Sequence, residues 1–212
     1  EKVGSDPSSL NTTAMLTPEG DAYVINGEKL WCTNGTIAEL IVVMACNPET
    51  KKISTFIVDT STVGVKVEKR CRFMGLKALA NAVISFTNVR VPVINRIGKE
   101  GAGLKIALVT LNTGRLALPA SAVGGVKVCM EMVRKRSNER VQWGHPIGKH
   151  EAIAHKLSDV ASTSFAMESV SQLSSRLSDR GGYDIRLEAA AAKEWNTCRG
   201  WEIVDDTMQI RG

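Results

Sequence analysis

The sequence predicts an α+β protein in which a β-sandwich or barrel domain is followed by an antiparallel α-helical bundle. Two observations carry this prediction. Residues 8–97 hold short β-branched runs separated by turn residues, which is typical of strands. From residue 101 onward, apolar residues recur at the three- and four-residue steps of a helix. Because the period changes near residue 98, we expect one domain at residues 1–97 and a second at residues 98–212.

Short strands are expected throughout the first domain, with turn residues such as Pro18, Gly20, Pro48 and Gly64 between them. Their expected ranges are residues 12–16, 23–25, 29–33, 41–45, 53–58, 63–68 and 82–91. Asn26-Gly27 is predicted to form a tight hairpin turn, because both residues tolerate a positive φ. Strands at this spacing favour a sandwich or a barrel.

A second Asn-Gly pair, Asn34-Gly35, closes the segment that begins at Asn26. Trp31 and Thr33 lie two residues apart between the two pairs, so we expect them on the same face of one strand. A large aromatic ring beside a hydroxyl donor would give a planar ligand a flat wall. These residues alone leave a second interpretation open, namely a core tryptophan on a half-buried strand with a threonine at the surface.

Long helices are expected in the second domain. Residues 103–139 form one helical stretch, which Pro119 is expected to kink. A second amphipathic helix is predicted from apolar residues at helical spacing, which are Ile153, Leu157, Val160, Met167, Val170, Leu173 and Leu177. Gly181-Gly182 ends it, and Asp184 is expected to cap a third helix that continues to about Gln209. Antiparallel helices with short loops indicate a bundle.

The charge pattern gives little support to nucleic-acid binding, because the net charge of +5 is spread along the chain without a basic block. The cluster Arg134-Lys135-Arg136 is interpreted as a solvated helix end, with contact to a phosphate-bearing ligand as the alternative. No run approaches the roughly 20 apolar residues of a membrane span. We therefore expect no transmembrane segment.

The cysteines are too scattered to form a disulfide framework, and the histidines are too scattered to form a metal site. The five cysteines include no CxxC pair, which indicates reduced thiols inside a cell. His145, His150 and His155 recur every five residues and do not share one helix face, so no metal site is predicted. The chain begins without a methionine or a signal peptide, and we expect it to be a piece of a longer polypeptide.

Several motifs, taken in their order, resemble the acyl-CoA dehydrogenase family. Four segments of this chain resemble the middle β-domain of that family, namely Gly4-Ser5-Asp6, residues 26–35, Met74-Gly75-Leu76 and residues 88–92. The C-terminal helical domain is similar at residues 111–115, 139–144 and 209–212. The segment 111–115 is similar to the very-long-chain branch. The resemblance covers essentially the whole chain, but not the family's N-terminal helical domain or its C-terminal end.

The resemblance implies FAD-dependent α,β-dehydrogenation of a fatty acyl-CoA thioester to the trans-2-enoyl-CoA, as in fatty acid β-oxidation. Such chemistry needs a carboxylate for the α-proton, a polarised thioester carbonyl and a hydride acceptor at the β-carbon. The redox step belongs to the cofactor, so the protein supplies position and electrostatics. Electron-transferring flavoprotein is the implied acceptor, and the implied location is the bacterial cytoplasm or the mitochondrial matrix.

The cofactor-binding residues implied by the resemblance lie in both domains. They are Ser5, Trp31, Cys32 and Thr33 in the first, and Arg140, Gln142, Trp143, Gln209 and Gly212 in the second. Trp31 and Thr33 would contact the flavin ring. The second group would reach the FAD of a neighbouring subunit, which implies a homodimer or a homotetramer. An arginine suits this role because its planar fork pairs with pyrophosphate oxygens.

The acyl-CoA is expected to contact Ser5, Asn112 and Arg115. The chain also departs from the family pattern: Glu1 stands where Thr-Glu-Pro-x-x-Gly-Ser-Asp has its proline. In a minority branch the catalytic base precedes the arginine of the long helix, but Gly114 occupies that position and cannot abstract a proton. No catalytic residue is therefore predicted within the chain, and the base is expected beyond Gly212.

Two other functions remain open at this point. One is an acyl-CoA oxidase-type flavoenzyme, in which oxygen reoxidises the flavin. The other is a flavin-binding assembly or interaction module without turnover. The residues present do not distinguish acyl chain lengths.

Overall fold

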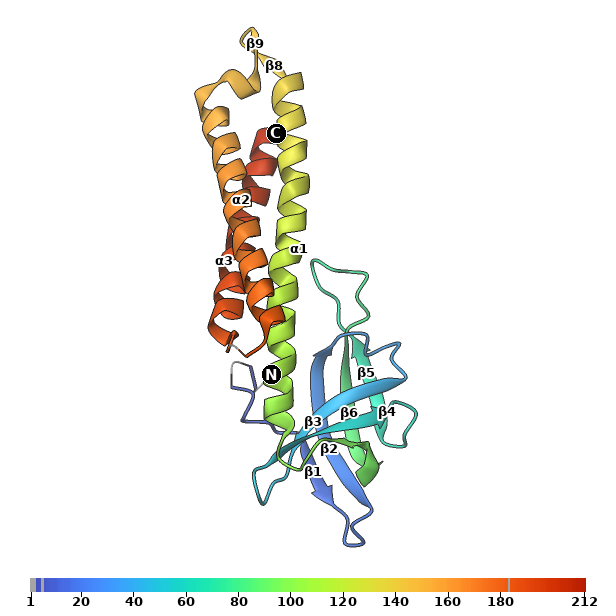
Figure 1. Cartoon of the computed structure of the whole chain (residues 1–212). Helices are drawn as coiled ribbons and strands as arrows, with labels where there is room; N and C mark the ends of the chain where they lie inside the picture. The colour runs from blue at the N-terminus through green and yellow to red at the C-terminus, as the bar shows by residue number, and fades with distance from the viewer. Residues whose placement is uncertain (1–2, 5, 183) are drawn as a thin grey trace. The chain divides into compact units, whose positions relative to one another are not determined.

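The computed structural model describes residues 3–4, 6–182 and 184–212. It divides into two compact units, residues 1–108 and residues 109–212. A curled sheet forms the first unit and three long helices form the second (Figure 1). The helix α1 (Gly103–Glu139) begins in the first unit and continues into the second.

The sheet of the first unit has seven strands in the order β5-β6-β2-β1-β3-β4-β7. The strands are β1 (Thr13–Leu16), β2 (Ala22–Cys32), β3 (Leu40–Cys46), β4 (Ile53–Asp59), β5 (Val65–Arg70), β6 (Ala82–Pro92) and β7 (Arg96–Ile97). A short helix η1 (Val93–Asn95) precedes β7. Neighbouring strands are antiparallel except β1 and β3, which are parallel and meet through the single pair Thr13 and Cys46.

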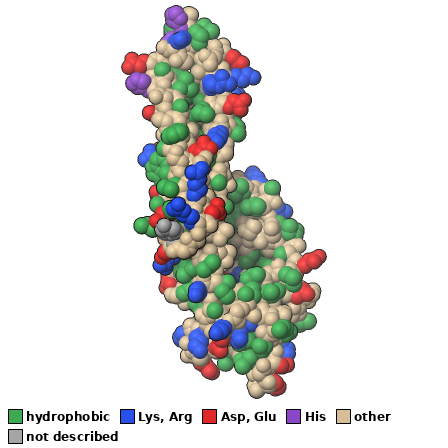
Figure 2. Space-filling model, viewed as in Figure 1, with side chains coloured by type: hydrophobic (Ala, Val, Ile, Leu, Met, Phe, Trp, Pro, Cys, Tyr) green, Lys and Arg blue, Asp and Glu red, His purple; other side chains and the backbone are tan. Residues whose placement is uncertain are grey.

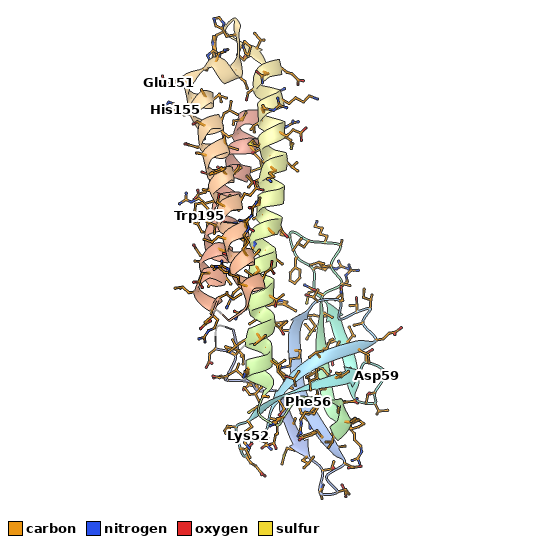
Figure 3. The ribbon with its side chains drawn as sticks, viewed as in Figure 1. Lys52, Phe56, Asp59, Glu151, His155 and Trp195 are labelled. Carbon is orange, nitrogen blue, oxygen red and sulfur yellow. The ribbon has the colours of Figure 1, made fainter. Side chains whose placement is uncertain are left out.

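One apolar core lies inside the curled sheet. Ile25, Phe56, Ile84 and Val89 come from β2, β4 and β6 and are fully buried there. The rings of Tyr23 and Phe56 meet with centroids 4.9 Å apart (Phe56 is labelled in Figure 3). Buried and exposed residues alternate at the end of β6, whereas the first four residues of β4 are all buried. The predicted all-β first part is confirmed, with strand ends that differ by a few residues.

The predicted hairpin turn at Asn26-Gly27 is wrong, because both residues lie inside the continuous strand β2. The register against β6 shifts between Ile25 and Gly27, which marks a β-bulge. Gly27 has φ +143°, and a Cβ there would lie 2.7 Å from Cα of Thr12. The Asn26 Oδ1 accepts the backbone N–H of Asn88 at 2.7 Å. Asn26 and Gly27 therefore allow neighbouring segments of the sheet to approach β2 closely, and they do not reverse the chain direction.

The second unit contains most of α1, then α2 (Glu151–Arg180) and α3 (Arg186–Arg211). A two-stranded hairpin, β8 (Val141–Gln142) and β9 (His145–Pro146), and the short helix η2 (Ile147–Lys149) connect α1 to α2. The helices share a core made of Val123, Val126, Val160, Met167 and Ile203, with Trp195 packed against it (Figure 3). The predicted helical bundle is confirmed in these three helices.

Details of the helices differ from expectation. The helix α1 continues through Pro119 without interruption. Gly181 ends α2 with φ +62°, as predicted. Asp184 does not occupy the N-cap of α3, which is Ile185, although its Oδ1 accepts the backbone N–H of Arg186 at 3.2 Å. The buried face of α2 uses three serines, Ser164, Ser171 and Ser174, whereas the predicted core residue Leu173 is exposed.

By length and composition alone, α1 is apolar enough to cross a membrane, which the sequence inspection did not anticipate. Only 22% of its most apolar window is buried. Part of its apolar surface serves the bundle, since Val123, Val126 and Val133 are buried there. The same test is met by core helices of soluble proteins, so the observation is weak evidence for a membrane span.

Candidate functional site

Trp31 is presented to solvent by a second irregularity of β2. The register against β6 shifts between Lys29 and Cys32, and Trp31 has φ +59°. Its side chain is 63% exposed. The strand ends at Cys32, and Thr33 lies in the following turn. The expectation that Trp31 and Thr33 share a strand face is therefore wrong, because a bulge and a strand end intervene.

The turn after Trp31 requires a glycine. The Gly35 N–H donates to the Cys32 carbonyl at 3.0 Å, and the Thr36 N–H donates to the Ala80 carbonyl at 3.3 Å. A Cβ on Gly35 would lie 2.9 Å from the Cys32 carbonyl oxygen and 3.0 Å from Cβ of Ala82. This close approach holds the Thr33 turn against β6.

Cys32 and Lys29 face the inside of the sheet, in contrast to Trp31. Each pairs in register with a fully buried residue of β6, Cys32 with Ala82 and Lys29 with Ile84. Burial raises the pKa of the Cys32 thiol, with a smaller opposing effect from Lys29. Burial also lowers the pKa of the Lys29 ammonium. Lys29 was not among the residues predicted from the sequence. It could have been found as a charged residue at a strand position whose side chain should face the core.

The hairpin β8–β9 carries Gln142 and Trp143, and Arg140 directly precedes it. The Arg140 carbonyl accepts the Ile147 N–H at 2.7 Å, and the His150 ring nitrogen Nε2 lies 3.0 Å from the Gln142 carbonyl. Trp143 is 87% exposed, and its ring meets that of His150 edge-on with centroids 5.5 Å apart. The hairpin thus presents an aromatic ring and an exposed arginine on a backbone held by hydrogen bonds.

The C-terminal end of α3 lies at the same end of the second unit as this hairpin. Arg136 lies one helical turn before Arg140, and its Nη2 donates to the Arg211 carbonyl at 3.3 Å. Lys156 of α2 forms an ion pair with Asp206 of α3. Arg136 is half-buried, whereas Arg134 and Lys135 are exposed at this helix end. The structure therefore brings the Arg140 hairpin and the segment of Gln209 and Gly212 together.

Asn112 and Arg115 lie elsewhere on α1. They are one helical turn apart, and the Arg115 Nη1 donates to the Asn112 Oδ1 at 3.0 Å. From Arg115 to Glu139 the helix rises about 36 Å at ~1.5 Å per residue, which exceeds the ~30 Å diameter of a small domain. Within one chain, the Asn112–Arg115 pair and the Arg140 hairpin do not meet.

Other predicted positions are less informative. Ser5 lies outside the described residues. The adjacent Asp6 carboxylate accepts the Ser8 and Ser9 hydroxyl groups, which lower its pKa. Met74 is fully exposed in the loop between β5 and β6, where Leu76 has φ +49°.

An open groove of about 530 Å³ lies between α1 and α2. Its lining residues are Ala120, Val123, Glu168, Ser171, Gln172, Ser175 and Arg176. Glu168 is paired with Lys127 at 2.7 Å. The α2 wall of the groove is polar, which does not suit a hydrocarbon ligand.

The described part of the chain contains no group of three or more histidine, cysteine, aspartate or glutamate side chains that could hold a metal ion. Histidines gather at one end of the helical unit (Figure 2), where His155 is paired with Glu151 at 3.8 Å (Figure 3).

Comparison with known families decides the relationship that the motifs indicated. The acyl-CoA dehydrogenase middle-domain model matches residues 1–89, and the acyl-CoA dehydrogenase C-terminal-domain model matches residues 101–212. The chain belongs to the acyl-CoA dehydrogenase family. The two models match the chain in order, the first within its β-rich part and the second over its helical part.

Individual acyl-CoA dehydrogenases agree with this assignment. The chain is 49% identical over 214 residues to probable acyl-CoA dehydrogenase FadE10 of Mycobacterium tuberculosis, covering 99% of the chain and 33% of that protein. It is 33% identical over 217 residues to the mitochondrial very long-chain specific acyl-CoA dehydrogenase of Bos taurus, again covering 99% and 33%. The chain therefore spans about a third of the length of these curated relatives.

A solved structure supports the same fold. An acyl-CoA dehydrogenase from Bacillus anthracis, complexed with FAD, superposes with a TM-score of 0.81 at 31% identity. The match covers 99% of this chain and 39% of that one.

Proposed function

We propose that the protein containing this chain binds FAD and catalyses α,β-dehydrogenation of fatty acyl-CoA thioesters to trans-2-enoyl-CoA. The observation that carries the proposal is the pair of ordered family matches together with a flavin-type platform at Trp31. An exposed tryptophan held at a positive φ is costly unless its orientation serves a purpose. A planar ring stacked on that surface would use the orientation.

The residues present fit FAD at two separate places. Trp31 offers a flat apolar face and Thr33 a hydroxyl in the adjoining turn, which suits an isoalloxazine ring. Arg140 has an exposed guanidinium with no side-chain hydrogen bond or ion pair within the described residues, which suits a pyrophosphate. Gln142, Trp143, Gln209 and Gly212 would complete the adenosine side. Cys32 would contribute through its backbone, since its side chain faces inward.

The separation along α1 supports a site shared between subunits. Arg115 and Arg140 are separated by about 36 Å of helix at ~1.5 Å per residue, so within one chain they cannot contact the same ligand group. We therefore place Arg140, Gln142 and Gln209 at the FAD of a neighbouring subunit, in a homodimer or homotetramer. Asn112 and Arg115, with Ser5, would contact the acyl-CoA of their own subunit.

FAD, when bound, supplies the hydride acceptor. The task of this chain is positional: the Trp31 platform would fix the ring, and the Asn112–Arg115 pair would orient the substrate. Gly114 offers no proton acceptor, so the base would come from a part of the protein outside residues 1–212. Electrons would leave through an electron-transferring flavoprotein, in the bacterial cytoplasm or in the mitochondrial matrix.

The test is anaerobic titration of the full-length, FAD-loaded protein with acyl-CoAs of different lengths. We expect bleaching of the flavin absorbance and formation of the enoyl product. Failure to bleach with every chain length would overturn the enzyme assignment in favour of a flavin-binding module. Peroxide formation in air without an added acceptor would instead assign an oxidase.

A further inference from the structure

The hairpin β8–β9 turns through Trp143 and Gly144, and both residues have a positive φ. Their φ angles are +50° and +81°, and Gln142 and His145 pair across this two-residue turn. Positive φ at both central residues matches a type I′ turn, which strongly favours asparagine followed by glycine. Gly144 fits that preference, but a bulky tryptophan at the first position is strained in the left-handed region. Trp143 therefore needs contacts that hold it there.

Burial contributes little to holding the turn within the described part of the chain. Trp143 is 87% exposed, and a Cβ on Gly144 would meet nothing within 4 Å. The side-chain amide of Gln142 donates to the carbonyl of the adjacent Val141 at 2.7 Å, which is a bond within its own strand. The contacts that hold the turn must therefore come from a specific neighbouring side chain.

His150 contacts two consecutive residues of the hairpin. Its ring nitrogen Nε2 lies 3.0 Å from the Gln142 carbonyl, and its ring meets that of Trp143 edge-on, with centroids 5.5 Å apart. Because a carbonyl oxygen only accepts hydrogen bonds, Nε2 carries the proton and donates it. Edge-to-face rings are favourable at centroid distances of about 4.5–7 Å. The two contacts thus act on the residue before the turn and on the first residue within it.

The backbone of His150 is fixed by the start of α2. His150 is the N-cap residue of that helix, and its carbonyl accepts the N–H groups of Ile153 and Ala154 at 3.0 and 2.9 Å. Its own N–H donates to the Ile147 carbonyl at 3.1 Å. Serine, threonine, aspartate and asparagine are preferred at an N-cap because their side chains accept helix N–H groups. The His150 side chain makes no such capping bond and contacts the hairpin instead.

We propose that His150 is a positioning residue of the FAD site, which holds Gln142 and Trp143 in the left-handed turn that presents the tryptophan ring to the adenosine half of the cofactor. The identity of the ligand rests on the proposed function, whereas the hold on the turn is a property of this chain alone. The apparent Kd of a ligand equals its Kd for the held turn divided by the fraction of molecules that hold it. His150 thus raises the affinity for FAD through the turn, without contacting the cofactor.

Three substitutions at His150 separate the donor from the ring. His150→Gln keeps an N–H donor at a similar reach, His150→Phe keeps an aromatic edge, and His150→Ala keeps neither. The readout is amide exchange of Ile147, whose N–H donates to the Arg140 carbonyl across the base of the hairpin at 2.7 Å. In the full-length apoprotein, we expect this exchange to be about tenfold faster in His150→Ala and about threefold faster in each of the other two variants.

Two amides of α2 serve as internal references. The N–H groups of Ile153 and Ala154 bond to the His150 backbone carbonyl, so their exchange should keep wild-type rates in all three variants. His155→Ala, at an exposed position of the same helix, is the matched control and should leave the exchange of Ile147 unchanged. Wild-type exchange of Ile147 in His150→Ala would overturn the proposal.

A second background separates the turn from the start of the helix, and it decides the case if α2 frays in His150→Ala. Asparagine adopts a positive φ readily, so Trp143→Asn makes the turn favourable without outside contacts. In that background, His150→Ala is expected to speed the exchange of Ile147 by no more than about threefold. An equal effect in both backgrounds would show that His150 serves only the start of α2, and would overturn the proposal.

Cofactor affinity tests the consequence for the site. The Kd of the full-length apoprotein for FAD is expected to rise about tenfold in His150→Ala and to stay unchanged in His155→Ala. The absorbance spectrum of bound flavin should match wild type at saturation, because the isoalloxazine is assigned to Trp31 and not to the hairpin. An altered flavin spectrum, or an unchanged Kd, would overturn the positioning role. A wild-type protein that binds no FAD would instead overturn the proposed function, while the exchange of Ile147 still tests the hold on the turn.

Discussion

Arg136 donates a hydrogen bond to the backbone carbonyl of Arg211, which ties the end of α1 to the end of α3. A cation at a helix C-terminus also complements the helix dipole. The contact holds together two segments that are far apart in the sequence, the Arg140 hairpin and the Gln209 segment. If both segments bind one cofactor, their relative position depends on this bond.

Replacing Arg136 tests that link. Arg136→Gln is expected to destabilise the last turn of α3 by about 0.5–1 kcal/mol, because a charged donor at the helix end is lost. Amide exchange at the end of α3 should accelerate, and the Kd of the full-length protein for FAD should increase. Arg134→Gln, at an exposed position on the same helix, is the control. Unchanged exchange in Arg136→Gln would contradict the role of the bond.

The spacing of Arg115 and Arg140 on α1 leads to a complementation prediction. In a dimer with shared sites, each site uses Arg115 of one subunit and Arg140 of the other. A subunit with Arg115→Ala still supplies Arg140 to the site of its partner, and a subunit with Arg140→Ala keeps Arg115 in its own site. Random mixing of the two inactive variants should restore about one quarter of the wild-type sites in a two-fold dimer. Activity of the reassociated mixture, compared with each variant alone, provides the measurement. A mixture no more active than its parents would place both arginines at one site within a subunit.

The backbone at Trp31 can be tested without any ligand. At φ +59° a β-branched residue is disfavoured, whereas asparagine tolerates the left-handed region. Trp31→Val is therefore expected to lower the free energy of unfolding by about 1 kcal/mol more than Trp31→Asn. Chemical denaturation of the two variants gives the comparison, and equal stabilities would show that the bulge relaxes.

The strands and helices were predictable because their periods are local properties of the sequence, but the candidate site was only partly predictable. Asn26-Gly27 resembles a turn, yet Thr12, a residue distant in sequence, sets the conformation of Gly27 by close approach. The bulge at Trp31 likewise depends on pairing with β6, so alternation along the strand could not place Thr33. The link between Arg136 and Arg211 joins helices whose register no local pattern reveals. The order of the motifs identified the candidate site residues. The directions of their side chains depend on contacts between segments that are distant in the sequence.

The packing of α3 gives a matched pair of glycine predictions. A Cβ on Gly200 would lie 3.6–3.8 Å from Ala122, Met167 and Val126, whereas one on Gly124 meets nothing within 4 Å. Gly200→Leu is expected to destabilise the bundle by about 1–3 kcal/mol through overpacking. Gly124→Ala should instead stabilise it by about 0.5–1 kcal/mol, because a helix interior prefers alanine to glycine. Thermal unfolding monitored by circular dichroism measures both, and a destabilising Gly124→Ala would indicate that another surface covers Gly124.

The start of α3 carries a pH-dependent contact between Asp184 and Arg186. The Arg186 guanidinium, followed by its backbone N–H, hydrogen-bonds the Asp184 carboxylate and lowers the pKa of that group from 3.8 to about 2. Because the folded pKa lies below the ordinary value, the stabilising effect is present above pH 3.8 and is lost as the pH falls toward 2.

Arg186→Gln is expected to raise the pKa of Asp184 toward its ordinary value, so that the stability difference from wild type disappears in acid. The Asp184 carboxyl carbon shift, followed by NMR from pH 6 down to about 2, measures the titration directly. Arg176→Gln, at an exposed arginine of α2, should leave that titration unchanged. If Asp184 titrates at the same pH in Arg186→Gln as in wild type, the guanidinium is not the cause of the lowered pKa. The turn before α3 would then have to hold the carboxylate through backbone N–H groups alone.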